Sequence, residues 1–113
     1  MNIPHFEYRG PTDVVLTSGD IERMGSWLME TFGGPEHLYG AVAHLHKEAD
    51  ELLLTPNDPH EVADPIIIAI HCGYAAGLSG AEIIRGLLEK HEINMNRTWG
   101  PRQADGVIEH IRE

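Results

Sequence analysis

The sequence predicts an all-α fold of four helices joined by short connections. Along four segments, apolar residues recur at spacings of three and four, the spacing that lines one face of a helix. Helix-start signals precede three of these segments, at Thr17, Asp58 and Ser79. No run of alternating apolar and polar residues indicates a strand, and no internal repeat appears. We therefore expect a single all-α domain over residues 1–113, a bundle of four helices.

The first helix follows an irregular lead-in over residues 1–17, in which residues 14–16 could form a short extended piece or packing arm. Thr17 and Asp20 have the spacing of a capping box. After them comes an apolar stripe made of Ile21, Met24, Leu28 and Phe32. The glycines and proline of residues 33–35 are expected to end this helix.

The second helix is expected to run from Pro35 or Glu36 to Leu54. Its apolar stripe consists of Leu38, Ala41, Val42, Leu45, Ala49 and Leu52. Glu48 falls inside this stripe, where a surface helix normally carries no acid. Because burying an acid without a partner costs free energy, Glu48 is expected to have a functional role.

Two starts are open for the third helix. Asp58 can cap a helix whose first residue is Pro59, with Glu61 in its first turn. Alternatively, Asp64 caps a helix that begins at Pro65, which would leave Glu61 in a loop. We favour the first start, in which Pro65 lies inside the helix, loses the hydrogen bond to the Glu61 carbonyl and kinks the axis. This helix should continue to Gly77, with Cys72 on its apolar face.

The fourth helix is predicted to start at the capping-box pattern of residues 79–82 and to extend towards Arg97. Residues 99–101, Trp-Gly-Pro, should end it. The C-terminal tail, residues 101–113, is expected to add one or two amphipathic helical turns through Val107, Ile108 and Ile111.

Composition narrows the function. Acids outnumber Lys and Arg by 18 to 8, for a net charge of −10. This balance argues against a polymeric nucleic-acid partner but not against a single nucleotide, because bound divalent metals can reverse the local field. No stretch approaches the ~20 apolar residues of a membrane span. The lone Cys72 and a start without signal-peptide features indicate a cytoplasmic location.

The main chemical signal is a quartet of acids in two pairs, Glu48 with Glu51 and Glu61 with Asp64. Residues three apart share a helix face, and the break at residues 55–59 lets two helices fold back so that the pairs converge. Two such charges about 5 Å apart repel by roughly 3 kcal/mol at an effective dielectric of about 20. The quartet therefore needs protons or cations, and oxygen ligands suit Mg²⁺ or Mn²⁺. The competing interpretation is a solvated charged face.

A second set, Lys90, Asn94 and Arg97, has the spacing of one helix face and the chemistry of a phosphate site. Alternatively, its cations only complement the carboxyl end of a helix. Trp27 could stack on a base, although tryptophans are more often core anchors. His44 and His60 each lie four residues before an acid of the quartet, and no histidine-metal site is indicated.

With these residues in place, the chain resembles the all-α MazG-like nucleoside triphosphate pyrophosphohydrolases, whose E-x-x-E and E-x-x-D pairs match the quartet. It is most similar to their phage-associated, MazZ-type branch of dATP/dGTP diphosphohydrolases. That similarity spans roughly residues 24–100. It rests on Trp27-Leu28 with Thr31-Phe32-Gly33, on Gly40, His44, Lys47 and Glu48, and on Lys90, Asn94, Arg97, Thr98 and Trp99. Pro65 departs from the helix-forming residue usual in the family.

The resemblance implies attack of water at the α-phosphorus of a (deoxy)nucleoside triphosphate, giving the monophosphate and pyrophosphate. It implies two or three Mg²⁺ or Mn²⁺ held by Glu48, Glu51, Glu61 and Asp64, with Glu48 or Glu51 orienting the water. The substrate contacts it implies are Lys90, Asn94, Arg97, Trp27, His44 and Lys47. It further implies a purine substrate, a homodimer or homotetramer, and host cytoplasm if the chain is phage-encoded.

Two interpretations from other classes compete with this one. The first is a non-catalytic helical oligomer that binds nucleotides or, through the tail at Val107 to Ile111, a protein partner. The second is a metal-dependent phosphatase, which would release orthophosphate instead of pyrophosphate.

Overall fold

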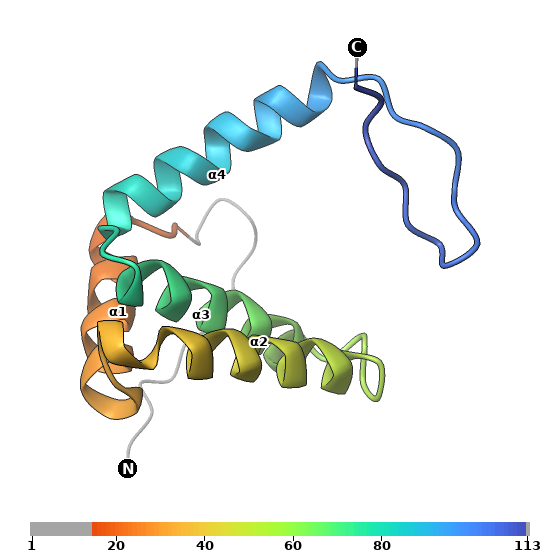
Figure 1. Ribbon diagram of the computed structural model, residues 1–113. Helices are drawn as coiled ribbons and strands as arrows, with labels where there is room; N and C mark the ends of the chain where they lie inside the picture. The colour runs from red at the N-terminus through yellow and green to blue at the C-terminus, as the bar shows by residue number, and fades with distance from the viewer. Residues whose placement is uncertain (1–14, 113) are drawn as a thin grey trace. The chain divides into compact units, whose positions relative to one another are not determined.

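The computed structural model describes residues 15–112 and contains four α-helices (Figure 1). These are α1, Ser18–Phe32, α2, Leu38–Leu52, α3, Pro59–Ala75, and α4, Gly80–Met95; a 3₁₀ turn, η2, spans Pro35–His37. Between residues 15 and 112 there is no strand, only one isolated β-bridge. The predicted all-α class is confirmed. Of the predicted irregular lead-in, residues 1–14 lie outside the described range and residues 15–17 have no regular structure.

The chain divides into two compact units at Gly80. The first unit contains α1, η2, α2 and α3, and the second contains α4 with the C-terminal segment. The single domain over residues 1–113 stays a prediction. Over the described range, no one helix is long and apolar enough to cross a membrane, and α3 and α4 reach that composition only when taken together across the break between them.

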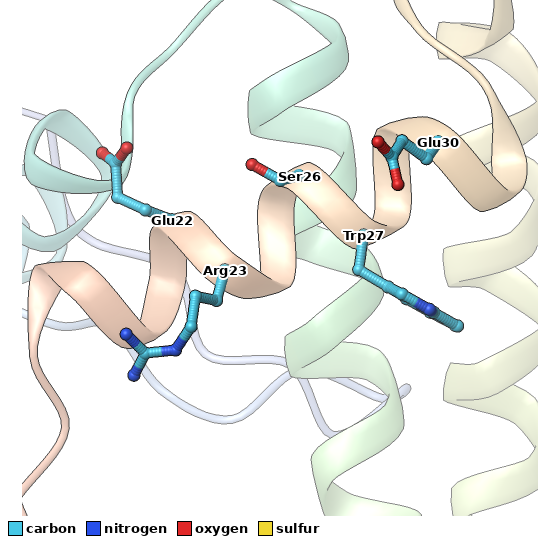
Figure 2. Close-up of a pocket in the computed structure, with 5 residues that line it drawn as sticks. All are labelled: Glu22, Arg23, Ser26, Trp27 and Glu30. Atoms are coloured by element: carbon cyan, nitrogen blue, oxygen red, sulfur yellow. The ribbon is translucent and has the colours of Figure 1, made fainter.

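One side of α1 packs in the first unit and the other carries polar side chains. Ile21, Gly25 and Leu28 are buried, as the predicted apolar stripe requires for Ile21 and Leu28. The outer side lines an open pocket of about 380 Å³, shown in Figure 2 and formed by Glu22, Arg23, Ser26, Trp27 and Glu30. This alternation of buried and exposed positions is what an amphipathic helix produces.

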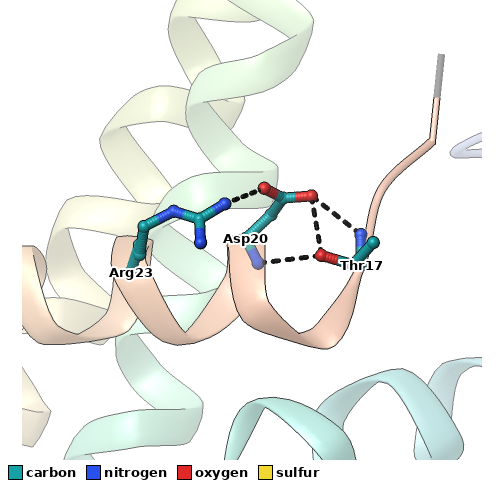
Figure 3. A network of polar contacts seen from close by, with 3 residues as sticks. All are labelled: Thr17, Asp20 and Arg23. Carbon is teal, nitrogen blue, oxygen red and sulfur yellow. Dashed lines mark hydrogen bonds and ion pairs between the residues drawn. The ribbon is translucent and has the colours of Figure 1, made fainter.

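The predicted capping box at the start of α1 is confirmed (Figure 3). The backbone N–H of Asp20 donates to Thr17 Oγ1 at 3.2 Å, and the N–H of Thr17 donates to Asp20 Oδ2 at 2.9 Å. Arg23 forms an ion pair with Asp20. The bonds from Thr17 hold the pKa of the Asp20 carboxyl below its usual value.

The second helix is shorter than predicted at both ends. The glycine at its approach, Gly33, has φ +118°, and Pro35 opens the 3₁₀ turn before α2 begins at Leu38. At the other end, the N–H of Leu54 donates to the carbonyl of Glu51 at 3.0 Å, a three-residue spacing that replaces the α-helical one. The predicted ends at residues 35 or 36 and 54 were therefore wrong by two or three residues at the start and two residues at the end.

The third helix uses the favoured start. Asp58 Oδ1 accepts the N–H of His60 at 2.9 Å, Pro59 is the first helical residue, and the alternative cap at Asp64 is wrong. The helix is continuous across Pro65 and ends at Ala75, two residues before the predicted Gly77. The N–H of Gly77, with φ +96°, donates to the Tyr74 carbonyl, and the next N–H donates to the Gly73 carbonyl. These two bonds form a Schellman motif, which ends the helix.

The core of the first unit lies where α3 packs against α1 and α2. Its buried side chains are Ile21, Leu28, Ala41, Ile68, Ile70, His71 and Ala75. Cys72, predicted in the core, is half-buried, and this burial raises the pKa of its thiol. Figure 1 shows α2 and α3 side by side and joined by a short loop, so they run antiparallel as predicted.

The helical tail predicted after residue 101 is wrong. The C-terminal segment instead folds back on itself, with Trp99 and His110 forming an antiparallel bridge. The N–H of Gly100 donates to the Glu109 carbonyl at 2.9 Å, and the N–H of Ile111 donates to the Thr98 carbonyl at 2.7 Å. The spacing of the apolar residues predicted helical turns wrongly, because a turn with Gly106 at φ +88° reverses the chain within the segment.

The contact between α1 and α3 depends on a glycine, and this can be tested. A Cβ added to Gly25 would lie 2.3 Å from the Tyr74 ring, so Gly25→Ala should destabilise the protein by about 1–3 kcal/mol through overpacking. Gly19→Ala, on the same helix, meets nothing closer than 3.5 Å and should be neutral or slightly stabilising. Urea unfolding of both variants measures the difference. Equal midpoints for the two variants would contradict this packing.

Candidate functional site

Three acids of the predicted quartet converge in the first unit. Glu48 and Glu51 from α2 and Glu61 from α3 each offer a carboxylate oxygen, and these atoms lie within 4.8 Å of one another. The antiparallel packing of α2 on α3 brings the two sequence pairs together. We call Glu48, Glu51 and Glu61 the acid trio.

Asp64 lies one turn further along α3, outside the acid trio. Its charge is nevertheless close enough to raise the pKa of Glu51. Asp64 is half-buried. Its role as a fourth metal ligand remains a prediction.

The side chain of Glu48 is largely buried. It is 15% exposed, and Oε1 accepts a hydrogen bond from His44 Nε2 at 3.1 Å. Its other oxygen, Oε2, is buried without a hydrogen-bond partner. A buried carboxylate oxygen without a partner costs free energy that a bound cation would offset. The position of Glu48 in the apolar stripe of its helix correctly indicated this partial burial.

The charges of the acid trio act on one another. The negative charge of Glu48 is the largest cause that raises the pKa of Glu51, and desolvation and the charges of Glu61 and Asp64 add to it. Glu51 itself is exposed. The site therefore favours a proton or a cation at Glu51, as expected for carboxylates held together.

A cavity of about 390 Å³ opens beside the acids. It is lined by His37, Gly40, Ala43, His44, Lys47, Glu48 and Glu51. His44 and Lys47, two of the predicted substrate contacts, thus share one cavity with two acids. Its volume is within the usual range for small-molecule sites.

A cluster of rings behind this cavity was missed by the sequence analysis. Phe32 packs its ring against the rings of Trp27, His44 and His71, with centroid distances of 5.6, 5.6 and 5.9 Å. His71 is fully buried, and its Nε2 donates to the Gly33 carbonyl at 2.9 Å. A signal was available, because His71 has apolar residues three and four positions away on both sides in α3.

Trp27 does not line the cavity of the acid trio. Its side chain is 55% exposed in the pocket of α1 (Figure 2), and its ring contacts Phe32, which in turn contacts His44. His60, the other histidine with a suitable spacing, lies exposed in the first turn of α3.

The remaining predicted contacts belong to the second unit. Arg97 lies two residues beyond the end of α4, so the predicted single helix face does not extend to it. It is nevertheless joined to Asn94, because Arg97 Nη1 donates to Asn94 Oδ1 at 3.1 Å. Trp99 Nε1 donates to the Asn94 carbonyl at 2.9 Å. Lys90 is exposed on α4.

Fold and site together define an all-α protein with a carboxylate centre suited to divalent cations. The model of the dATP/dGTP pyrophosphohydrolase family matches residues 20–113. A dATP/dGTP diphosphohydrolase of Cyanophage S-2L is 36% identical over 74 residues, which cover 64% of this chain and 67% of the relative. The chain therefore belongs to the dATP/dGTP pyrophosphohydrolase family, and it is a nucleotide pyrophosphohydrolase.

A solved structure supports the same assignment. It is a MazG-like pyrophosphohydrolase of Cyanophage S-2L bound to dGDP and three catalytic Mn²⁺ ions per active site. The TM-score is 0.64 at 27% identity, with 87% of this chain and all of that chain covered. The predicted family, fold class and enzyme class are confirmed, and the predicted cofactor class agrees with both this relative and the acid trio.

The repulsion at Glu51 predicts how metal-free stability depends on pH. A carboxyl whose pKa is raised by folding adds stability below its ordinary value of 4.5, and this is lost as the pH rises through the raised value. Glu51→Gln should therefore raise the melting temperature of the chelator-treated protein at neutral pH, but not below the ordinary glutamate pKa. Circular dichroism melts at the two pH values measure this.

Asp50→Asn is the matched control for Glu51→Gln, because Asp50 is an exposed acid on the same helix and outside the acid trio. An equal rise in the melting temperature of both variants at neutral pH would assign the effect to net charge instead of to the trio.

Proposed function

We propose that this pyrophosphohydrolase acts on dATP and dGTP at the acid trio, where water attacks the α-phosphorus and leaves the deoxynucleoside monophosphate and pyrophosphate. The observation that carries the proposal is the buried, partnerless Glu48 Oε2 within a trio of mutually repelling carboxylates. Family membership supports the reaction, and the dGDP bound by the solved relative supports a purine substrate.

The residues that would hold the cations are Glu48, Glu51, Glu61 and Asp64. All four are carboxylates, the ligands that Mg²⁺ and Mn²⁺ prefer, and the unsatisfied oxygen of Glu48 fits a cation in particular. Bound divalent cations would neutralise phosphate oxygens and lower the pKa of a coordinated water. The three catalytic Mn²⁺ ions of the solved relative support two or three ions here.

The two catalytic acids have different surroundings, which suggests different roles. His44 fixes one oxygen of Glu48, so this carboxylate is held in place. Glu51 is exposed beside the cavity, and the charge of Glu48 raises its pKa. Of these two acids, Glu51 is the one whose exposed side chain opens to the cavity. We therefore assign to Glu51 the orientation of the attacking water.

Other side chains bind the substrate. Lys47 lines the cavity beside the acids, and its ammonium group suits a phosphate oxygen. Lys90, Asn94 and Arg97 have donors that suit phosphate or ribose, and Trp27 offers an exposed ring for a base. A homodimer or homotetramer and a cytoplasmic location complete the proposal by resemblance.

The proposed site is tested first by Glu48→Gln, which keeps the shape of the side chain and removes its charge. Pyrophosphate release from dGTP or dATP with Mn²⁺ should fall by about 100-fold or more, with circular dichroism unchanged. Asp50→Asn should retain activity. Unchanged hydrolysis by Glu48→Gln would disprove the site, and orthophosphate as the first product by chromatography would disprove attack at the α-phosphorus.

The hydrogen bond between His44 and Glu48 gives a second test. His44→Ala should weaken Mn²⁺ binding by about 10- to 100-fold, because groups that orient a metal ligand have effects of this size. His46→Ala is the matched control, an exposed histidine two residues along the same helix. Isothermal titration calorimetry with Mn²⁺ compares the variants. Identical dissociation constants for the two variants would show that His44 does not support Glu48.

A further inference from the structure

The fold-back of the C-terminal segment places new basic residues beside Arg97. The bridge between Trp99 and His110, with the bond from the Ile111 N–H to the Thr98 carbonyl, brings residues 110–112 next to residues 96–98. Arg112 and His110 thereby become neighbours of Arg97, although they are 15 and 13 positions away in sequence. Sequence spacing gave no sign of this grouping.

These residues enclose a pocket of about 480 Å³. It is lined by Asn96, Arg97, Thr98, His110, Ile111 and Arg112. The six lining residues include two arginines and no acid, in a chain whose net charge is −10. We call this pocket the C-terminal basic pocket. A concentration of cations in an acidic protein calls for an anionic ligand.

The donors of the pocket are held in place. Arg97 is fixed by its bond to Asn94 Oδ1, and a guanidinium carries five N–H donors, so this bond leaves donors for a forked contact with phosphate. The ring of His110 packs edge-on against Trp99 with a centroid distance of 6.0 Å. Asn94 and Trp99, which hold these two side chains, belong to the same unit as the pocket.

The charges around His110 agree with the positive lining of the pocket. Burial, and then the charges of Arg97, Arg112 and Lys90, lower the pKa of His110, with Glu109 opposing them. Lys90 on α4, which does not line the pocket, adds to the positive field at His110. A bound anion would relieve the mutual repulsion of these cations.

We propose that the C-terminal basic pocket binds a pyrophosphoryl group, with Arg112 and His110 acting beside Arg97. Two guanidinium groups in one pocket match a multiply charged diphosphate better than a carboxylate or other singly charged anion. The diphosphate is either the terminal part of the triphosphate substrate or the released product. Only this choice of source rests on the proposed function, because pyrophosphate binding as such needs no metal centre.

The test is calorimetric titration of inorganic pyrophosphate into the full chain in the presence of a chelator. Arg112→Ala should weaken binding by about 10- to 100-fold, the loss expected for one charge-assisted contact, and Arg112→Lys should recover part of it. Arg102→Ala removes the same charge from the same segment outside the pocket and should bind like wild type. Equal affinities for Arg112→Ala and Arg102→Ala, or no binding by wild type, would overturn the proposal.

Two further measurements separate this pocket from the metal site. Glu48→Gln should bind pyrophosphate as wild type does, and loss of binding in that variant would overturn an independent pocket. Arg112→Ala should raise the KM for the triphosphate more than it lowers kcat if the substrate uses the pocket. An unchanged KM with weakened pyrophosphate binding would assign the pocket to the product. If the chain released no pyrophosphate from any triphosphate, the proposed function would be disproved. The titration would still show whether the pocket binds pyrophosphate.

Discussion

The packing of α2 against α3 forces like charges together, and the site depends on how this repulsion is met. Three carboxylates lie within 4.8 Å, one of them with a buried oxygen that has no partner. Protein side chains compensate only part of this negative charge, through the hydrogen bond from His44 to Glu48. Bound cations would complete this site, so metal binding would be coupled to the stability of the helix pair.

The residues behind the acids explain how such a strained arrangement keeps its geometry. His71 is buried and bonds to the Gly33 carbonyl, which fixes the turn between α1 and α2. Phe32, just before that turn, packs against both His71 and His44. The orientation of Glu48 is thus linked to the core through rings and not through further charges. Ring packing and hydrogen bonds of this kind orient the acids of the site.

Local signals in the sequence were sufficient for most of the fold. The capping box of Thr17 and Asp20 and the start at Asp58 and Pro59 depend on neighbouring residues only, and both were confirmed. The convergence of the acids could also be predicted, because the two acid pairs lie on two helices joined by one short loop. The metal and substrate roles of individual residues remain predictions.

Contacts between residues distant in sequence could not be predicted from local sequence patterns. The bond from His71 to Gly33 spans 38 positions, and nothing local marks it. The C-terminal fold-back joins Thr98 to Ile111 through backbone groups, which every residue except proline carries alike. Apolar spacing at Val107, Ile108 and Ile111 therefore predicted helical turns where the backbone pairs across a reversal instead.

Pro65 makes the two ends of α3 differ in how firmly hydrogen bonds and packing hold them. It has no N–H, so the carbonyl of Glu61 receives no bond from that position and one rung of the helix is missing. Downstream, Ile68, Ile70 and Ala75 anchor the helix in the core, whereas the turn that bears Glu61 is tied to them by fewer bonds. The turn that bears Glu61 therefore depends for its position on the cap at Asp58 and on its packing against α2.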